Sequence, residues 1–551
     1  MTCRITVACT ACIFASALVA AQAPSPAPAT SVTPATTYVN TTGSLGSLCS
    51  SQAGLQTALQ GVASNQDTAG LGIPIPASLN NPASLQQVAQ IAFQYIYTYA
   101  IPLYSKSLAG NSANGTQINT FYSSNDHLAN YNDTGGVTPN HDTLYNLAFL
   151  DLSLGPQIIT VPQFDTSRRY WIVPFADAYY NIYGAIGSHF NSSSGQYLVV
   201  GRNGTRDTTA YPGFTSDRIF FSPTDINWVI GRVLVLNDTD TPAAYAFSQQ
   251  YRVSPYNPLL NLTLNNANSK AQIISRSVNG SGYGVYKNTV GYLAGLSAQQ
   301  PAAWFNASLV FYQTDPPGNG TSAAEVSILQ GLIQNASDPS QASAFQLGNQ
   351  VASKCIIKTN LEFVASTGWT FHNDSGSYNQ ANGIDYLGRA QDAQFIPTPL
   401  PPSEVIYYLL STDSQGQPLD ASKGQNYTIT FNLPIPASIF WSLTIYNSSN
   451  LLLFQNPINR YNINDRSQGL VYTGTNNNTL QVFISASAPA NGTSQYANWL
   501  PAPTDAGFQF IFRTYGPTDS AIQGQYAPPA VVKTTLAATV ISSSIAGRKF
   551  V

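Results

Sequence analysis

The stretch that decides the fold class is residues 427–431, Tyr-Thr-Ile-Thr-Phe, in which β-branched and aromatic residues follow one another. Comparable short runs occupy residues 440–446, 480–484 and 508–512, and residues such as Asn, Gly and Pro separate them. This composition is typical of β-strands, because branched and aromatic side chains pack well on a pleated surface. We therefore expect a β domain in the C-terminal part of the chain.

The same pattern occurs earlier, for example at residues 157–161 (Gln-Ile-Ile-Thr-Val) and 170–173 (Tyr-Trp-Ile-Val). Helical spacing of apolar residues lies between the two β blocks, most clearly over residues 321–365. The expected fold class is therefore α+β and β-rich, with two jelly-roll or β-sandwich-like domains and a helical middle segment.

These patterns divide the chain into six segments. They are a signal peptide at 1–21, a Pro/Ser/Thr-rich tether with an N-terminal segment at 22–82, an N-terminal β domain at 83–250, a helical middle region at 251–395, a C-terminal β domain at 396–530 and a tail at 531–551. Arg4 precedes an apolar run that ends in small residues at Ala20 and Ala21, which is typical of a secretory signal. We expect a secreted, extracellular protein, and no later apolar run is long enough to predict a membrane span.

Charged residues make up only 9% of the chain, and the formal net charge is -3. Typical soluble proteins contain about 25% charged residues. Because no basic field is present, nucleic acid is excluded as an expected partner. Attached sugars would help to keep so uncharged a surface hydrated, and the chain is dense in Asn-x-Ser/Thr sequons. These sequons begin at Asn40, Asn114, Asn132, Asn191, Asn203, Asn237, Asn261, Asn279, Asn306, Asn319, Asn335, Asn373, Asn426, Asn447, Asn477 and Asn491.

Two cysteines, Cys49 and Cys355, remain once the expected signal peptide is removed. In an oxidising compartment they are expected to form one disulfide, and two separate buried thiols are the alternative. The histidines show neither HxxxH nor HxH spacing, so no metal site is predicted. No nucleotide or dinucleotide glycine fingerprint occurs, so no cofactor is expected either.

The candidate catalytic residues are His127, Asp142, Tyr145 and Asp177, which concentrate titratable groups in a chain that has few of them. Buried titratable groups are costly unless they pair or take part in function, so we expect the four to line one pocket. His127 or Asp142 would then act as the acid or base, and Tyr145, Asp177 and Arg169 would orient the substrate. The alternative is structural: Asp142 would be a buried hydrogen-bond lock.

Several motifs in order resemble two domains of unknown function. Residues 140–156, 169–170, 177–181 and 230–232 resemble family 1254; residues 440–446, 459–461, 498–503 and 513–515 resemble its companion, family 1214. The chain is similar to a secreted, fungal-type member of this pair. The resemblance implies two jelly-roll-like β domains, and it implies no particular reaction.

Aromatic residues alternate with Asn and Arg in the C-terminal motifs, a mixture that suits a sugar because its C–H face stacks on aromatic rings. The candidate binding residues are Arg169, Trp441, Tyr446, Arg460, Tyr461, Asn498, Trp499 and Arg513. The structural alternative is that an Arg beside a strand Tyr is a lock, and that Asn-Trp-Leu-Pro is a buried corner.

Two functions follow from these patterns. The first is an extracellular enzyme that acts on a glycan or a small secreted metabolite. The alternative is a non-catalytic extracellular surface protein that binds a carbohydrate or another ligand. The concentration of His, Asp and Tyr in one loop slightly favours the enzyme.

Secretion is directly testable. We expect the mature protein in the culture medium, beginning near Ala21 or Gln22 and heavier than its chain mass because of attached glycans. N-terminal sequencing and intact mass spectrometry measure both properties. An intracellular product at the bare polypeptide mass would contradict the expectation.

Overall fold

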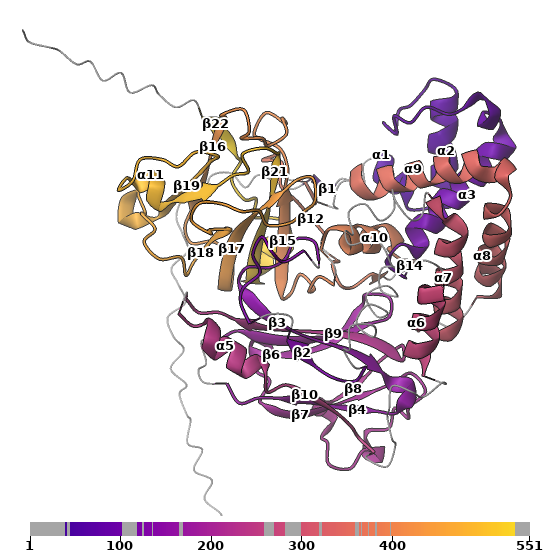
Figure 1. Ribbon diagram of the computed structural model, residues 1–551, viewed down its shortest axis with the longest axis horizontal. Coiled ribbons are helices and arrows are strands. Elements are labelled where there is room, and N and C mark those ends of the chain that lie inside the picture. Colours follow the sequence, from indigo (N-terminus) through magenta and orange to yellow (C-terminus); the bar gives the residue numbers. More distant parts are fainter. Residues whose placement is uncertain are drawn as a thin grey trace, which may run out of the picture. The chain divides into compact units, whose positions relative to one another are not determined.

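The computed structural model describes residues 39–40, 44–101, 118–123, 126–134, 136–164, 169–237, 239–257, 269–280, 299–318, 322–358, 363–364, 366–372, 374–380, 383–396 and 398–534 (Figure 1). The expected signal peptide, residues 22–38 of the tether and residues 535–551 of the tail lie outside the described residues. The described part is a mixed α+β, β-rich fold, as the sequence predicted.

The N-terminal sandwich is built from two sheets. The larger has the strand order β2 (Tyr122–Ser123), β3 (Thr143–Asp151), β9 (Ile226–Leu234), β5 (Trp171–Asp177), β6 (Ile182–Gly187); the smaller has β10 (Arg252–Pro255), β4 (Gln157–Val161), β7 (Gly195–Val200), β8 (Ile219–Phe221). Leu150 and Val173 of the larger sheet share one apolar core with Ile159 and Val199 of the smaller. Helix α5 (Thr241–Ser248) packs beside β3 and β9.

The C-terminal sandwich has the same two-layer plan. Its larger sheet has the order β1 (Val39–Asn40), β11 (Phe363–Val364), β12 (Thr370–Phe371), β15 (Val405–Leu410), β21 (Phe508–Pro517), β17 (Ala437–Asn447), β18 (Asn462–Asn464); its smaller sheet has β20 (Trp499–Pro501), β19 (Thr479–Ser485), β16 (Asn426–Asn432), β22 (Val532–Thr534). Tyr408 and Phe512 pack with Ile429 and Val482 across the two layers. Each smaller sheet contains one parallel pair of strands, β7 with β8 and β19 with β20.

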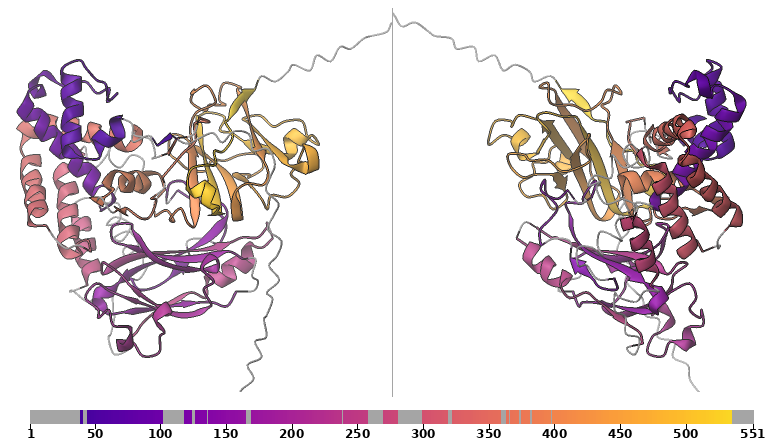
Figure 2. Two further views of the ribbon diagram at one scale, coloured as in Figure 1. Left: turned by 180° about the vertical axis from the view of Figure 1, so that it is seen from behind. Right: turned by 45° about the vertical axis from the view of Figure 1, so that its right-hand side comes forward.

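Helices from two distant parts of the sequence form one apolar core (Figure 2). They are α1 (Ser44–Cys49), α2 (Gln52–Ala63) and α3 (Pro82–Thr98), together with α6 (Lys270–Gly280), α7 (Pro301–Thr314), α8 (Ala323–Ala336), α9 (Ala342–Lys358) and α10 (Tyr386–Phe395). Helix α3 begins where Asn81 accepts a hydrogen bond from the Ser84 backbone N–H at 3.0 Å, with Pro82 in the first turn. Its apolar residues then recur at helical spacing and face α9.

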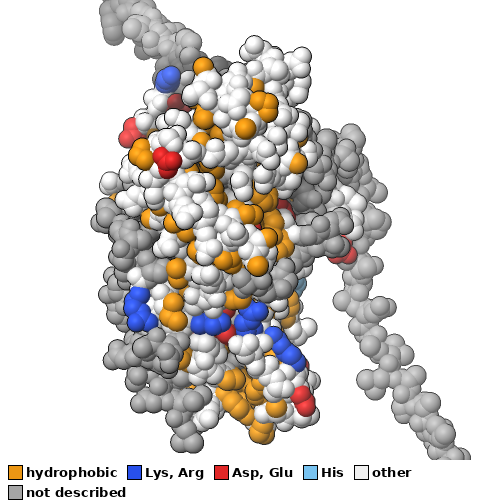
Figure 3. Space-filling model, turned by 90° about the vertical axis from the view of Figure 1, so that its right-hand side faces the viewer, with side chains coloured by type: hydrophobic (Ala, Val, Ile, Leu, Met, Phe, Trp, Pro, Cys, Tyr) orange, Lys and Arg blue, Asp and Glu red, His pale blue; other side chains and the backbone are white. Residues whose placement is uncertain are grey.

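A short hairpin of β13 (Asn379–Gln380) and β14 (Gly383–Ile384) precedes α10. No helix of the described residues is long and apolar enough to cross a membrane. On the face shown in Figure 3 most side chains are uncharged, in keeping with the 9% charged residues of the chain.

Cys49 and Cys355 form the predicted disulfide, with their Cα atoms 5.8 Å apart. Cys49 ends α1 and Cys355 lies in α9, so the bond joins segments separated by 306 residues. Both cysteines are fully buried in the helical core. The disulfide therefore holds the first described helices against α9.

Reduction of this bond is expected to destabilise the helical core. Replacing both cysteines by Ser should lower the free energy of unfolding by up to about 5 kcal/mol, because the cross-link restricts a very long loop of the unfolded chain. Thermal melting of the double variant against wild type measures the loss. Labelling of two thiols by a maleimide in the denatured, unreduced protein would rule the bridge out.

Candidate ligand-binding pockets beside Arg466

A buried set of hydrogen bonds, here called the seam, joins the loop before β3 to the C-terminal sandwich. Asn140 donates from Nδ2 to the Tyr515 hydroxyl at 2.9 Å. The Tyr446 hydroxyl donates to the Pro139 carbonyl at 2.8 Å, and Arg513 Nη2 donates to the Thr138 carbonyl at 3.2 Å. Residues more than 300 positions apart in the chain are therefore fastened together here.

Asp142 is the acidic member of the seam, and only 1% of its surface is exposed. Its Oδ1 accepts hydrogen bonds from Asn462 Nδ2 at 3.1 Å, Asn464 Nδ2 at 3.3 Å and Arg466 Nη2 at 2.8 Å. All three donors belong to β18 or to the turn that follows it. Oδ2 has no hydrogen-bond partner within the described part of the chain.

Arg466 continues this network toward a second carboxyl group. Its Nη1 donates to Asp465 Oδ1 at 2.6 Å, and its guanidinium carbon lies 4.6 Å from the centre of the Phe440 ring. Burial raises the pKa of Asp465 to about 6, although the Arg466 charge acts to lower it. Arg466 therefore connects the buried carboxylate of Asp142 with the carboxyl group of Asp465, whose pKa burial raises to about 6.

The polar pocket, with a volume of about 250 Å³, lies on the Asp142 side of Arg466. Most of its walls are hydrogen-bonding side chains from the two sandwiches. They are Leu128, His141, Asp142, Val235, Leu236, Asn237, Ile458, Asn459, Arg460, Tyr461, Asn462, Asn464, Arg466, Ser467 and Gln468. His141 meets the ring of Tyr461 edge-on, with ring centres 5.0 Å apart.

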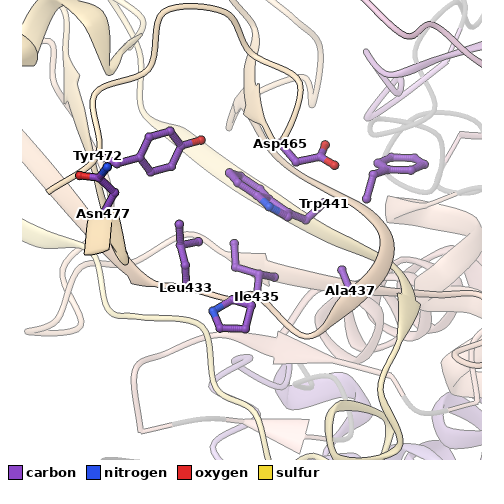
Figure 4. A pocket seen from close by; sticks show the side chains of 9 residues that line it. Leu433, Ile435, Ala437, Trp441, Asp465, Tyr472 and Asn477 are labelled. Carbon is purple, nitrogen blue, oxygen red and sulfur yellow. The ribbon is translucent and has the colours of Figure 1, made fainter. Parts of the chain in front are cut away.

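The aromatic pocket, with a volume of about 490 Å³, lies within the C-terminal sandwich. It is lined by Leu433, Pro434, Ile435, Ala437, Phe440, Trp441, Asp465, Tyr472 and Asn477. Figure 4 shows the Trp441 indole next to the carboxyl group of Asp465. Leu433 and Ile435 line the opposite side, and Tyr472 lies beside Asn477 at one end.

The two pockets meet at Arg466. This residue lines the polar pocket, while its partners Asp465 and Phe440 line the aromatic pocket. A ligand that spans both would meet stacking surfaces on one side and planar polar groups on the other. This combination of an apolar face and a few placed polar groups is typical of small-molecule sites.

The structure does not bring the four expected catalytic residues into one pocket. Asp142 precedes Thr143, which pairs with Leu234, whereas Asp177 pairs with Asn227. Seven residues of β9 separate these two positions, which is roughly 23 Å along a strand. Asp177 instead caps the β5–β6 turn, where it accepts hydrogen bonds from the backbone N–H groups of Tyr179 and Asn181.

His127 and Tyr145 also differ from the expected catalytic arrangement. His127 is 45% exposed, and its ring nitrogens contact Asp126 at 2.8 Å and Asp133 at 3.2 Å. Hydrogen bonding to Asp126 raises the pKa of His127. Tyr145 lies in β3, where burial raises the pKa of its hydroxyl and Arg232 lies over its ring at 5.8 Å.

Three of the expected binding residues line the pockets. Trp441 belongs to the aromatic pocket, and Arg460 and Tyr461 belong to the polar pocket. Arg460 also donates from Nη1 to the carbonyls of Ala497 and Trp499 at 2.9 and 2.8 Å.

The other five expected binding residues make hydrogen bonds that hold parts of the fold together, as the structural alternative stated for several of them. Tyr446 and Arg513 belong to the seam. Arg169 forms a two-pronged ion pair with Asp240.

Asn498 and Trp499 form a buried corner. Asn498 accepts a hydrogen bond from the Val471 backbone N–H at 2.8 Å and donates one to the Val471 carbonyl at 2.7 Å. Trp499 is fully buried and donates to the Ser485 carbonyl at 3.1 Å. The polar groups of Asn498 and Trp499 are therefore used in hydrogen bonds within the protein.

Sequence reasoning missed Asp465, Arg466 and Tyr472, which are central to the pockets. The polar run Asn462-Ile463-Asn464-Asp465-Arg466 follows directly after Asn459-Arg460-Tyr461, and that continuity could have identified them. Within the described residues no group of His, Cys, Asp or Glu is arranged to hold a metal ion.

Comparisons with known proteins agree with the two-domain resemblance. The family model described as "Protein of unknown function (DUF1254)" matches residues 118–255, and the one described as "Protein of unknown function (DUF1214)" matches residues 404–519. The chain therefore carries the two domains in the predicted order. No curated protein matches.

Two solved structures match much of this chain. The VPA0106 protein from Vibrio parahaemolyticus has a TM-score of 0.50 at 20% identity, covering 82% of this chain and 100% of that chain. An uncharacterised protein from Burkholderia cenocepacia has a TM-score of 0.39 at 12% identity, covering 90% of this chain and 99% of that chain. At 20% identity, the likeness to the VPA0106 protein is evidence for the fold alone.

The variant Asp142→Asn tests the seam. The change removes the charge that pairs with Arg466, so we expect the free energy of unfolding to fall by about 1 to 3 kcal/mol. Thermal melting measures the loss, and Asp505→Asn is the control because Asp505 is an exposed residue of the C-terminal sandwich, which supplies the partners of Asp142. A variant that melts with wild type would show that Asp142 is not a structural lock.

Proposed function

We propose that this chain, which carries a DUF1254 domain followed by a DUF1214 domain, is a secreted glycoprotein that binds a carbohydrate beside Arg466. The observation that carries the proposal is the aromatic pocket, where Trp441 and Tyr472 stand with the carboxyl group of Asp465. Its volume of about 490 Å³ falls within the range of roughly 300 to 1,000 Å³ that ligand pockets occupy.

The chemistry of the two pockets favours a sugar over a purely apolar ligand. A sugar ring presents C–H groups that stack on Tyr472 and on the exposed part of Trp441, a residue that is 7% exposed, and its hydroxyl groups donate hydrogen bonds to Asp465. The adjoining polar pocket offers amide side chains such as those of Asn459 and Gln468.

Binding without catalysis is favoured over an enzyme. An acid/base mechanism needs two groups within reach of one reacting bond. Asp177 lies at the other end of the sheet from Asp142, and the Asp142 carboxylate is buried and already accepts three hydrogen bonds through Oδ1. The expected catalytic set therefore gives no support to hydrolysis.

Secretion and glycosylation are supported by two further observations. The Cys49–Cys355 disulfide suits an oxidising compartment. Among the sequon asparagines whose side chains the structure describes, none is buried. The exposed ones are Asn132, Asn191, Asn203, Asn237, Asn306, Asn335, Asn477 and Asn491, and Asn426 and Asn447 are partly exposed.

Asp465→Asn tests carbohydrate binding. Loss of a charged acceptor should weaken binding of a matching sugar at pH 7 by about tenfold or more, because hydrogen bonds to charged groups contribute about 1.5 to 3 kcal/mol. Isothermal titration against a panel of mono- and oligosaccharides measures it, with the protein freed of N-linked glycans by an amidase. Asp505→Asn is the matched control.

The pH dependence of wild type gives an independent check. The Asp465 pKa of about 6 means that its carboxylate form dominates at pH 7 and is lost as the pH falls toward 5. Sugar affinity should therefore decline over that interval in wild type and stay flat in Asp465→Asn. An Asp465→Asn variant that binds as tightly as wild type at pH 7 would contradict the proposed site.

A further inference from the structure

A glycosylation sequon stands on the rim of the aromatic pocket. Asn477 lines this pocket, its side chain is exposed, and Asn477-Asn478-Thr479 is an Asn-x-Thr sequence. Within the described part of the chain its side-chain amide makes no hydrogen bond, so the nitrogen that would carry a glycan is free.

The turn that carries Asn477 holds it in a defined position. Asn476 and Asn477 both have left-handed backbone angles, with φ of 59° and 55°, a conformation that Asn tolerates. Thr473 and Thr479 close the turn with two backbone hydrogen bonds of 2.8 and 2.9 Å. Strand β19 begins at Thr479 and is paired on both sides, so the first sugar on Asn477 would start next to the end of an inner strand.

The pocket also offers what the first sugar of an N-linked glycan needs. That sugar, N-acetylglucosamine, carries an apolar methyl group and an amide as well as hydroxyl groups. Leu433 and Ile435 provide an apolar wall, and Tyr472 and Trp441 provide aromatic faces. Asp465 provides a hydrogen-bond acceptor beside Trp441, away from Asn477's end of the pocket (Figure 4).

We propose that the N-linked glycan of Asn477 folds back into the aromatic pocket and masks it from free sugars. Attachment would form a bond from Asn477 Nδ2 to C1 of N-acetylglucosamine, supplied by a lipid-diphosphate oligosaccharide. The bond from C1 to the diphosphate oxygen breaks, and the lipid diphosphate leaves with that electron pair while Nδ2 loses one proton. The inference rests on the proposed function, since it requires a pocket that recognises carbohydrate.

Masking would follow from the covalent bond that holds the glycan on Asn477. A ligand joined to the rim by a short link has an effective concentration on the order of millimolar or higher, and it competes with free sugar at every moment. Trimming or loss of this one glycan would then expose the binding site. The glycan of Asn477 would in this way regulate the pocket beside it.

The test compares Asn477→Gln with Asn491→Gln, both expressed with their glycans. Asn491 is the matched control because it is an exposed sequon of the same sandwich that does not line the pocket. We expect peptide mapping to find wild-type Asn477 occupied, and Asn477→Gln to bind free N-acetylglucosamine or its β-1,4-linked dimer at least tenfold more tightly than wild type. Asn491→Gln should bind like wild type, and adding Asp465→Asn to Asn477→Gln should abolish the gain.

Four results would overturn the inference, and only the last of them would also overturn the proposed function. An unoccupied Asn477, or equal sugar affinity in wild type and Asn477→Gln, removes the masking role and leaves the carbohydrate pocket standing. A gain of affinity in Asn491→Gln of the same size would assign masking to glycans in general. If Asn477→Gln, freed of its remaining glycans, binds no sugar of the panel, the proposed function fails and the inference fails with it.

Discussion

The carboxylate of Asp142 is the interaction on which the arrangement of the candidate site depends. A charge buried to this degree must be paired and hydrogen-bonded, or its desolvation would outweigh what it contributes. Its partners Asn462, Asn464 and Arg466 all come from the C-terminal sandwich, while Asp142 itself leads into β3 of the N-terminal one. The same contact therefore joins the sandwiches and sets the position of Arg466, which forms the boundary between the two pockets.

Several of the chain's few charged residues are buried in the described part of the structure. Arg232 and Arg513 are buried without a carboxylate ion pair in the described residues, and hydroxyl and carbonyl oxygens accept their hydrogen bonds instead. The Glu404 carboxylate, also buried, receives the Tyr170 hydroxyl and a ring nitrogen of His189, both at 2.6 Å. Low charge content therefore does not mean that charge is unimportant, because buried groups such as Asp142 and Glu404 link segments that lie far apart in the sequence.

This organisation changes how the motif residues are interpreted. The sequence predicts a catalytic role for Asp142 and a ligand-binding role for Tyr446 and Arg513. The structure instead places all three in the seam, where they form hydrogen bonds between the two sandwiches. The candidate polar pocket lies beside them and is lined by Arg466.

The sequence by itself determined the order of β and helical blocks, the two-domain resemblance and the disulfide partners. Each depends on local pattern or on a small number of candidates: alternating branched residues predict strands, and two cysteines can pair in only one way. The tertiary structure alone decided which polar residues face a pocket and which face another sandwich. Trp441 and Trp499 show the reason, since both follow similar strand signals, yet one lines the aromatic pocket and the other is fully buried in a corner. Strand pairing likewise placed Asp142 and Asp177 at opposite ends of one sheet, and that separation arises from contacts between distant segments, which no local pattern encodes.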